Sequence, residues 1–340
     1  MDLKTMRGVD KMSYEYGYGK LEDELISLFR SGAPDFEAAE KLIEQGADLN
    51  ADGSTEDNVL SEILQGYWWS ESGDEIPDDD EETENKNPEL GLNMCRIIRF
   101  FLEHGFDVNK FNGCYGAQCL YALTLSTFDK YMVEATKILF DAGARNGTTS
   151  IRGESDSTPW EFIGAEGSYQ DTCEQDHECG NVFEAVYQMY LAIDEGRPYK
   201  GIDSFHTAIG KTIQKVYAVK DGDKPIFYPV DLPNFKKNNC YNSTLYFVYE
   251  GGALITTEYG DFWTDTVVPE DNIVEVSEYF PSLIGRTVKA FTFDHRNVIK
   301  GTTNYGQPIT KIETESGESV TFSINFGDVK KENRAAFFEI

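Results

Sequence analysis

The sequence is poor in basic residues. Its 340 positions hold 30 Lys and Arg against 60 Asp and Glu, which gives a formal net charge of -30 at pH 7. Such a surface repels nucleic acids and anionic membranes within a screening length of about 8 Å at physiological salt. We therefore predict no nucleic-acid or membrane partner and favour a neutral or basic protein. The alternative interpretation is that the charge only keeps the chain in solution.

Long apolar runs are also missing. Residues Met1–Lys20 carry charges, glycines and tyrosines, and neither they nor any later stretch has an apolar run typical of a signal peptide or a membrane span. Without an export signal, cysteines are most simply reduced thiols. The six cysteines are Cys95, Cys114, Cys119, Cys173, Cys179 and Cys240. We expect a cytoplasmic protein.

The common motifs of catalysis are absent as well. The chain has no Gly-x-x-x-x-Gly-Lys-Ser/Thr loop, no Gly-x-Ser-x-Gly elbow and no His-Glu-x-x-His helix. Nucleophilic catalysis requires a base within hydrogen-bond reach of the nucleophile, and no such pair is evident. We predict no catalytic residue, no cofactor and no enzymatic activity.

One short segment has the residue types of a metal site. Cys173, His177 and Cys179 lie within seven residues, together with three carboxylates. Zinc accepts these ligands, but structural zinc sites usually use Cys-x-x-Cys pairs, which the chain lacks. We predict no metal site, although the sequence leaves this question open.

A pattern of amphipathic segment, apolar pair and glycine occurs three times. The apolar pairs are Leu42/Ile43, Phe101/Leu102 and Leu139/Phe140, and the glycines are Gly46, Gly105 and Gly143. Apolar residues three and four positions apart share one side of a helix. The glycine then ends that helix, because the left-handed conformation is cheapest without a Cβ.

The clearest copy, Phe101–Asn109, resembles the second helix and turn of the ankyrin repeat, whose family phrase is Leu-Leu-x-x-Gly-Ala-Asp-Val-Asn. Residues 157–160, Ser-Thr-Pro-Trp, are similar to the family's Thr-Pro-Leu-His opening, with Trp160 in place of leucine. The resemblance covers about residues 20–196. It implies stacked helical hairpins, with the last and most degenerate unit closing on a helix over 183–195.

The helical pattern is interrupted by a very acidic stretch. Residues 71–89 contain ten Asp and Glu, one lysine and two prolines, without periodic apolar positions. Such a segment buries too little apolar surface to offset its ordering entropy. We interpret it as an insertion in the second helical unit. It lacks the alternation and the central glycine of an EF-hand loop, so we do not expect calcium binding.

After residue 198 the pattern changes to a period of two. Short β-branched and aromatic runs alternate with Asp-Gly, Pro and Gly-Gly breaks, which is typical of strands and hairpins. Residues 209–216 also align with residues 284–291. We predict an α+β protein of two domains: an ankyrin-like domain over 1–198 and a mainly β domain over 199–340 with an internal duplication.

The ankyrin resemblance implies a non-catalytic scaffold that binds another protein in a groove. Exposed aromatic residues make strong interface anchors, and an acidic segment accelerates association with a basic partner. The predicted partner-binding residues are Tyr67, Trp68, Trp69, Asp78, Asp79, Asp80, Tyr115 and Trp160. A narrower hypothesis is an inhibitor or immunity-type protein for a basic toxin. The alternative is that the β domain is a hydrolase or carbohydrate-binding module with the repeats as an accessory.

Overall fold

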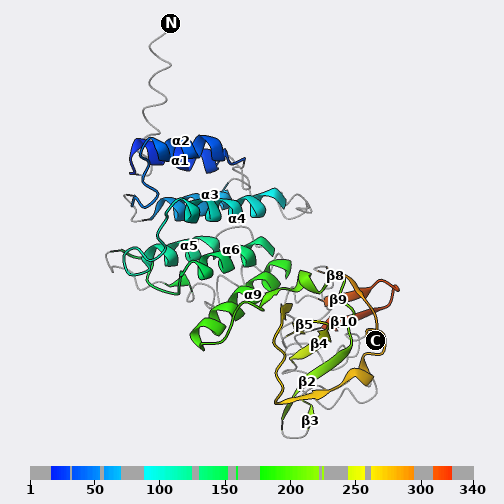
Figure 1. The fold of residues 1–340 in the computed structure, drawn as a ribbon. Helices are drawn as coiled ribbons and strands as arrows, with labels where there is room; N and C mark the ends of the chain where they lie inside the picture. Colours follow the sequence, from blue (N-terminus) through cyan, green and yellow to red (C-terminus); the bar gives the residue numbers. More distant parts are fainter. Residues whose placement is uncertain are drawn as a thin grey trace, which may run out of the picture. The chain divides into compact units, whose positions relative to one another are not determined.

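The computed structural model divides into two compact units, Met1–Ala165 and Glu166–Ile340, which we treat separately (Figure 1). Within them the structure describes residues 17–30, 33–53, 57–69, 88–124, 130–151, 158–159, 177–221, 224–225, 244–256, 262–294 and 309–323. These residues form seven α-helices, and in the C-terminal half antiparallel sheets. The predicted α+β composition is therefore confirmed.

The described residues of the first unit include three pairs of helices. The pairs are α1 (Lys20–Arg30) with α2 (Phe36–Glu44), α3 (Val59–Trp69) with α4 (Pro88–Glu103), and α5 (Cys114–Thr124) with α6 (Lys130–Asp141). Successive pairs are also in contact, because α3 packs against both α1 and α5, and α4 packs against α6. Figure 1 shows the pairs as successive layers, coloured from blue to green.

The second helix of each pair ends at a left-handed glycine. Gly46, Gly105 and Gly143 have φ angles of 105°, 94° and 108°. After α2, the amide of Gly46 donates to Ile43 O and the next amide donates to Leu42 O, each at 3.0 Å. The same two bonds close α4 and α6. The predicted glycine stop is thus confirmed, with the hydrogen bonds of a Schellman cap.

Aromatic rings join the first two pairs of helices. The ring of Phe29 in α1 lies 5.6 Å from Phe36 in α2, and 5.8 Å from both Phe100 and Phe101 in α4. Tilted ring pairs at these distances stabilise a core by about 0.5–1.5 kcal/mol beyond the burial of their area. Phe101, from the apolar pair before Gly105, is therefore part of the packed face of α4.

Helix α9 (His177–Asp194) covers residues 183–194 of the helix predicted over 183–195, but its packing differs from the expectation. It contacts β1 (Asp203–Ser204), β6 (Phe262–Asp265) and the short helix η1 (Phe205–Ala208) of the second unit. The division between the units accordingly falls before α9, whereas the sequence analysis placed the domain boundary after residue 198. Helix α9 belongs to the second unit because its apolar face packs there. Val182, Ala185 and Met189 on this helix are fully buried.

In the second unit, the residues that the structure describes form two antiparallel sheets. The larger contains β1 (Asp203–Ser204), β2 (Lys215–Asp221), β3 (Lys224–Pro225), β4 (Leu245–Tyr249), β5 (Gly252–Thr256), β6 (Phe262–Asp265) and β7 (Ile273–Glu275). Its order is β1-β6-β5-β4-β2-β3, and β7 also pairs with β2. The smaller contains β8 (Val288–Asp294), β9 (Ile309–Thr314) and β10 (Ser319–Ser323), in the order β10-β9-β8. Two short helices, η1 (Phe205–Ala208) and η4 (Ser277–Tyr279), precede β2 and β8.

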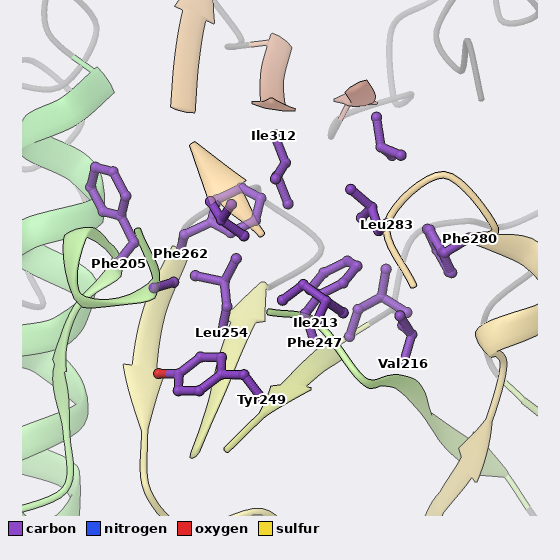
Figure 2. Close-up of a cluster of buried hydrophobic side chains, with 14 of the residues drawn as sticks. Phe205, Ile213, Val216, Phe247, Tyr249, Leu254, Phe262, Phe280, Leu283 and Ile312 are labelled. Atoms are coloured by element: carbon purple, nitrogen blue, oxygen red, sulfur yellow. The ribbon is translucent and has the colours of Figure 1, made fainter. Parts of the chain in front are cut away.

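One hydrophobic core joins these two sheets (Figure 2). The larger sheet contributes Phe247 and Leu254, and the smaller contributes Ile312 and Val320. Alternate residues of β4 are buried, as expected for a strand with one face on the core. The core therefore belongs to both sheets rather than to either one alone.

The two aligned segments, 209–216 and 284–291, lie against each other in the structure. Gly210 and Gly285 are both left-handed, with φ angles of 80° and 72°. The amide of Gly210 donates to Val288 O at 2.8 Å, and the amide of Gly285 donates to Ile213 O at 2.7 Å. In the alignment Gly210 corresponds to Gly285, and Ile213 corresponds to Val288. The two hydrogen bonds therefore join equivalent residues in opposite directions.

A second pair of hydrogen bonds has the same relation. Val288 donates to Lys211 O at 2.9 Å, and Ile213 donates to Arg286 O at 3.0 Å. Between these bonds Thr212 pairs with Thr287, and their hydroxyl oxygens are 2.9 Å apart. The two segments are therefore related by a local two-fold axis that passes close to this threonine pair.

The strands after these segments also correspond. β2, β4 and β5 form one antiparallel three-stranded meander, and β8, β9 and β10 form another. In each meander the last hairpin turns at a left-handed glycine, Gly251 with φ 92° and Gly317 with φ 84°. The two meanders thus share strand order, turn position and the preceding glycine.

Replacing Gly210 or Gly285 by alanine is expected to lower the free energy of unfolding by about 1 kcal/mol at either site. A Cβ at either glycine would meet no atom within 4 Å, so the cost is the left-handed backbone and not a clash. Urea unfolding of the full chain measures both effects. Gly147→Ala is the control, because Gly147 lacks a left-handed φ and its Cβ would make only ordinary contacts. If one of the two alanine variants leaves the free energy of unfolding unchanged, Gly210 and Gly285 are not structurally equivalent.

Candidate functional site

The loops after α2 and α4 have the same hydrogen-bonded turn. Asn50 donates its amide to Asp48 Oδ1 at 2.9 Å, and Asn109 donates its amide to Asp107 Oδ1 at 2.9 Å. These are Asx turns, in which a carboxylate accepts from the backbone two residues later. The aspartate and asparagine of the repeated phrase therefore fix the shape of both loops.

Asn50 connects the first loop to the second. Its side-chain amide donates to Gly105 O at 3.0 Å, and its Oδ1 accepts from the amide of Asp107 at 2.8 Å. Its backbone carbonyl accepts from Lys110 Nζ at 2.5 Å and from the Tyr115 hydroxyl at 3.0 Å. Loops linked in this way are ordered before a partner arrives, which lowers the entropic cost of binding.

Asn109 occupies the equivalent position against the third turn. A Cβ added to Gly143 would lie 3.3 Å from Asn109 Nδ2, so the asparagine side chain lies directly against that glycine. Asn50 is placed in the same way beside Gly105. The asparagine of the repeated phrase therefore contacts the glycine turn of the next unit in both cases.

A buried asparagine joins α3 to α5. Asn58 donates its side-chain amide to Gln118 Oε1 at 2.8 Å and to Tyr115 O at 3.2 Å, and its Oδ1 accepts from the amide of Ser61 at 2.8 Å. Gln118 in turn donates to Thr149 O at 2.9 Å. Asn58 thus caps α3. Through Gln118 it also connects α3 to the loop that follows α6.

The loop surface is acidic. Asp48, Asp52 and Asp107 are exposed, and Lys110 is the basic residue among them. Burial raises the pKa of the Tyr115 hydroxyl, and the carboxylates of Asp52 and then Asp48 raise it further. The whole first unit contains 33 acidic and 14 basic residues, so most of the excess negative charge belongs to it. This surface favours a cationic ligand.

The structure corrects the expectation for Tyr115. The residue is 0% exposed, its ring stacks on Phe106 with centroids 6.0 Å apart, and its hydroxyl is bonded to Asn50. Helix α5 begins at Cys114, which places Tyr115 in its first turn against the core. A fully buried ring cannot anchor a partner, so Tyr115 has a structural role.

The other predicted anchors are not placed by the structure. Helix α3 extends through Tyr67, Trp68 and Trp69, but their side chains lie outside the described residues. Asp78, Asp79, Asp80 and Trp160 also lie outside them. These residues remain predictions from the sequence.

One exposed aromatic residue, Phe111, is not among those predicted from the sequence. Three large apolar side chains are exposed in the described part of the chain, and Phe111, at 44%, is the only aromatic one of the three. Phe111 and Asn112 have left-handed φ angles of 51° and 58°. This conformation costs about 1–2 kcal/mol for a residue other than glycine. The Asn112-Gly113 turn signal could have identified this loop position.

Among the described residues of the second unit, the closest approach to catalytic geometry is a serine–histidine pair. Ser204 Oγ and His206 Nδ1 are 2.8 Å apart, but Ser204 is only 1% exposed. Its Oγ also accepts from the amide of His206 at 3.2 Å, as the cap of η1. The hydroxyl of Thr264 donates to Ser204 O at 3.2 Å. This cluster therefore closes a corner of the fold, and its serine is not accessible to a substrate.

The described cysteines are consistent with reduced thiols. Cys95, Cys114 and Cys119 are buried thiols, and burial raises the pKa of the Cys119 thiol. Among the described side chains, no three His, Cys, Asp or Glu residues lie close enough to hold a metal ion. Cys173 lies outside the described residues, as do the side chains of His177 and Cys179.

No protein-family model, curated protein or solved structure matches the chain. The described helices include none with the length and apolar character needed to cross a membrane. The cytoplasmic location stays a prediction from the sequence.

Proposed function

We propose that the first unit is an ankyrin-like repeat stack and that the protein is a non-catalytic scaffold that binds another protein. The observation that carries this proposal is the chain of asparagine contacts between loops, in which Asn50 bonds to Gly105 and Asp107 and Asn109 lies against Gly143. These contacts repeat from one helical pair to the next, as expected of stacked repeats. They also hold the loops in one preformed surface.

The proposed partner is a neutral or basic protein. The exposed carboxylates of Asp48, Asp52 and Asp107 support this choice, together with the net charge of -30. Complementary charge raises the association rate more than the final affinity. The acidic segment 71–89 would add to this attraction. The narrower proposal is an inhibitor or immunity-type protein that masks a basic toxin.

We further propose that the two β meanders are copies of one ancestral unit and serve the scaffold rather than catalysis. The paired hydrogen bonds around Thr212 and Thr287 support the duplication. The buried cap formed by Ser204 argues against a serine hydrolase at that position. A carbohydrate-binding role has no specific observation in its favour.

Affinity capture followed by reconstitution tests the proposed function. Proteins captured from an extract of the source cells are identified, purified and titrated against the full chain at 50 and 500 mM salt. We expect a basic partner whose Kd rises at least about tenfold at high salt, because screening weakens its attraction to the acidic surface. Asp52→Asn should weaken binding at low salt. Glu250→Gln is the matched control, since it removes an exposed carboxylate from the β4–β5 hairpin.

A captured partner that binds equally at both salt concentrations would contradict the electrostatic part of this proposal. A partner that binds the chain equally after Asp52→Asn and after Glu250→Gln would contradict the placement of the binding surface. Turnover of any substrate by the purified chain would contradict the non-catalytic assignment.

A further inference from the structure

The tight turn between the loop after α4 and the start of α5 presents Phe111 at the surface. Phe111, Asn112 and Gly113 are three consecutive left-handed residues, with φ angles of 51°, 58° and 89°. Backbone bonds fix this turn, because Gly113 donates to Asn109 O at 3.0 Å and Cys114 donates to Phe111 O at 3.2 Å. The unusual conformation is therefore set by the fold and not by the phenylalanine itself.

The ring of Phe111 contacts one aromatic ring and one ammonium group. It lies 5.4 Å from the ring of Tyr115, and Lys110 Nζ lies 5.1 Å from both ring centroids. Lys110 is itself fixed by its bond to Asn50 O. The residue is 44% exposed, so part of it remains accessible to a ligand. The structure thus provides a preordered aromatic surface that pays little entropy on binding.

The charges around this ring favour a cation. The loops that meet at Tyr115 carry the exposed carboxylates of Asp48, Asp52 and Asp107 against the single ammonium group of Lys110, which is already bonded. Asp48 and Asp52 lie two residues before and after Asn50, whose carbonyl accepts from the Tyr115 hydroxyl. Arginine suits such a site, because its planar guanidinium stacks on aromatic faces and also bonds to carboxylates.

We propose that Phe111 is the anchor at which a basic polypeptide segment docks, with an arginine side chain stacked on the exposed ring and neighbouring basic residues facing Asp52 and Asp107. This inference rests on the proposed function and specifies its surface and its partner chemistry. The site is fixed by the Asn50 contacts to the adjacent repeat, so it requires two stacked units and not one loop alone.

The test measures the Kd of the full chain for a fluorescent nona-arginine peptide and for nona-lysine at 150 mM salt, by anisotropy. All variants are made in a chain in which Asp78, Asp79, Asp80, Glu81 and Glu82 are replaced by the corresponding amides, so that this acidic run does not dominate binding. Phe111→Leu keeps an apolar side chain but removes the aromatic face. Phe111→Tyr keeps the face. Ile209→Ala is the control, because Ile209 is equally exposed, at 44%, in the other unit.

We expect Phe111→Leu to raise the Kd for nona-arginine about threefold to tenfold, with a smaller effect on nona-lysine. Phe111→Tyr and Ile209→Ala should leave both values within twofold of the parent chain. Equal Kd values for the parent and Phe111→Leu, or no binding of nona-arginine to the parent, would overturn the proposed anchor. Neither result would overturn the scaffold function, which is judged separately by the captured partner. Circular dichroism verifies that each variant is folded.

Discussion

Asn58→Ala is expected to lower the free energy of unfolding of the helical unit by about 3 kcal/mol. The substitution removes the cap of α3 and leaves buried Gln118 Oε1, Tyr115 O and the amide of Ser61 without this partner. Each buried polar group that loses its hydrogen bond costs about 1–3 kcal/mol. Because Asn58 connects α3 to α5, the stack should lose cooperativity as well as stability.

Urea unfolding followed by far-ultraviolet circular dichroism measures this effect, because the helices dominate that signal. Gln45→Ala is the control. Gln45 ends α2, and its exposed side chain donates to Lys41 O at 3.0 Å, so its loss should change stability by less than about 0.5 kcal/mol. If the two variants unfold at the same urea concentration, Asn58 does not link the helical pairs.

Phe205→Ala and Phe280→Ala are each expected to destabilise the second unit by about 3–5 kcal/mol. Both side chains are buried in the core that joins the sheets, and they precede the aligned segments by the same number of residues (Figure 2). The ring of Phe205 lies 5.0 Å from Phe291, and the ring of Phe280 lies 5.6 Å from Phe247. If the two β meanders are duplicates, the two costs should be similar.

Near-ultraviolet circular dichroism during guanidinium unfolding measures both variants. Phe205→Leu and Phe280→Leu lower the free energy of unfolding less than the alanine variants do. They allow the same comparison if either alanine variant does not fold. Ile209→Ala, at an exposed position in the same region, should change stability by less than about 0.5 kcal/mol. A large cost at one phenylalanine with almost none at the other would contradict the proposed equivalence of the two meanders.

The sequence predicts those parts of the fold that depend on local patterns. A left-handed glycine after an apolar pair is a local event, and the glycine stops at Gly46, Gly105 and Gly143 are confirmed. The change from helical spacing to a period of two likewise marks the antiparallel strands after residue 198. The alignment of 209–216 with 284–291 corresponds to two segments that bond to each other in the structure.

The differences occur where tertiary contacts decide the outcome. Helix α9 was expected to complete the helical stack, but its apolar side chains are buried where it contacts β1 and β6, and periodicity alone does not identify that neighbour. Tyr115 was expected at the surface, but it lies in the first turn of α5 and its side chain is buried in the core. Phe111 was overlooked since an isolated phenylalanine is usually buried, and only the turn that follows it brings it to the surface.

Hydrogen exchange of the full chain with and without its purified captured partner tests the central claim most directly. If the helical stack binds that partner, backbone amides of the loops 47–53 and 106–113 should gain protection, while those of β2, β4 and β9 should not change. Protection confined to residues 203–323, with both loops unaffected, would contradict the account.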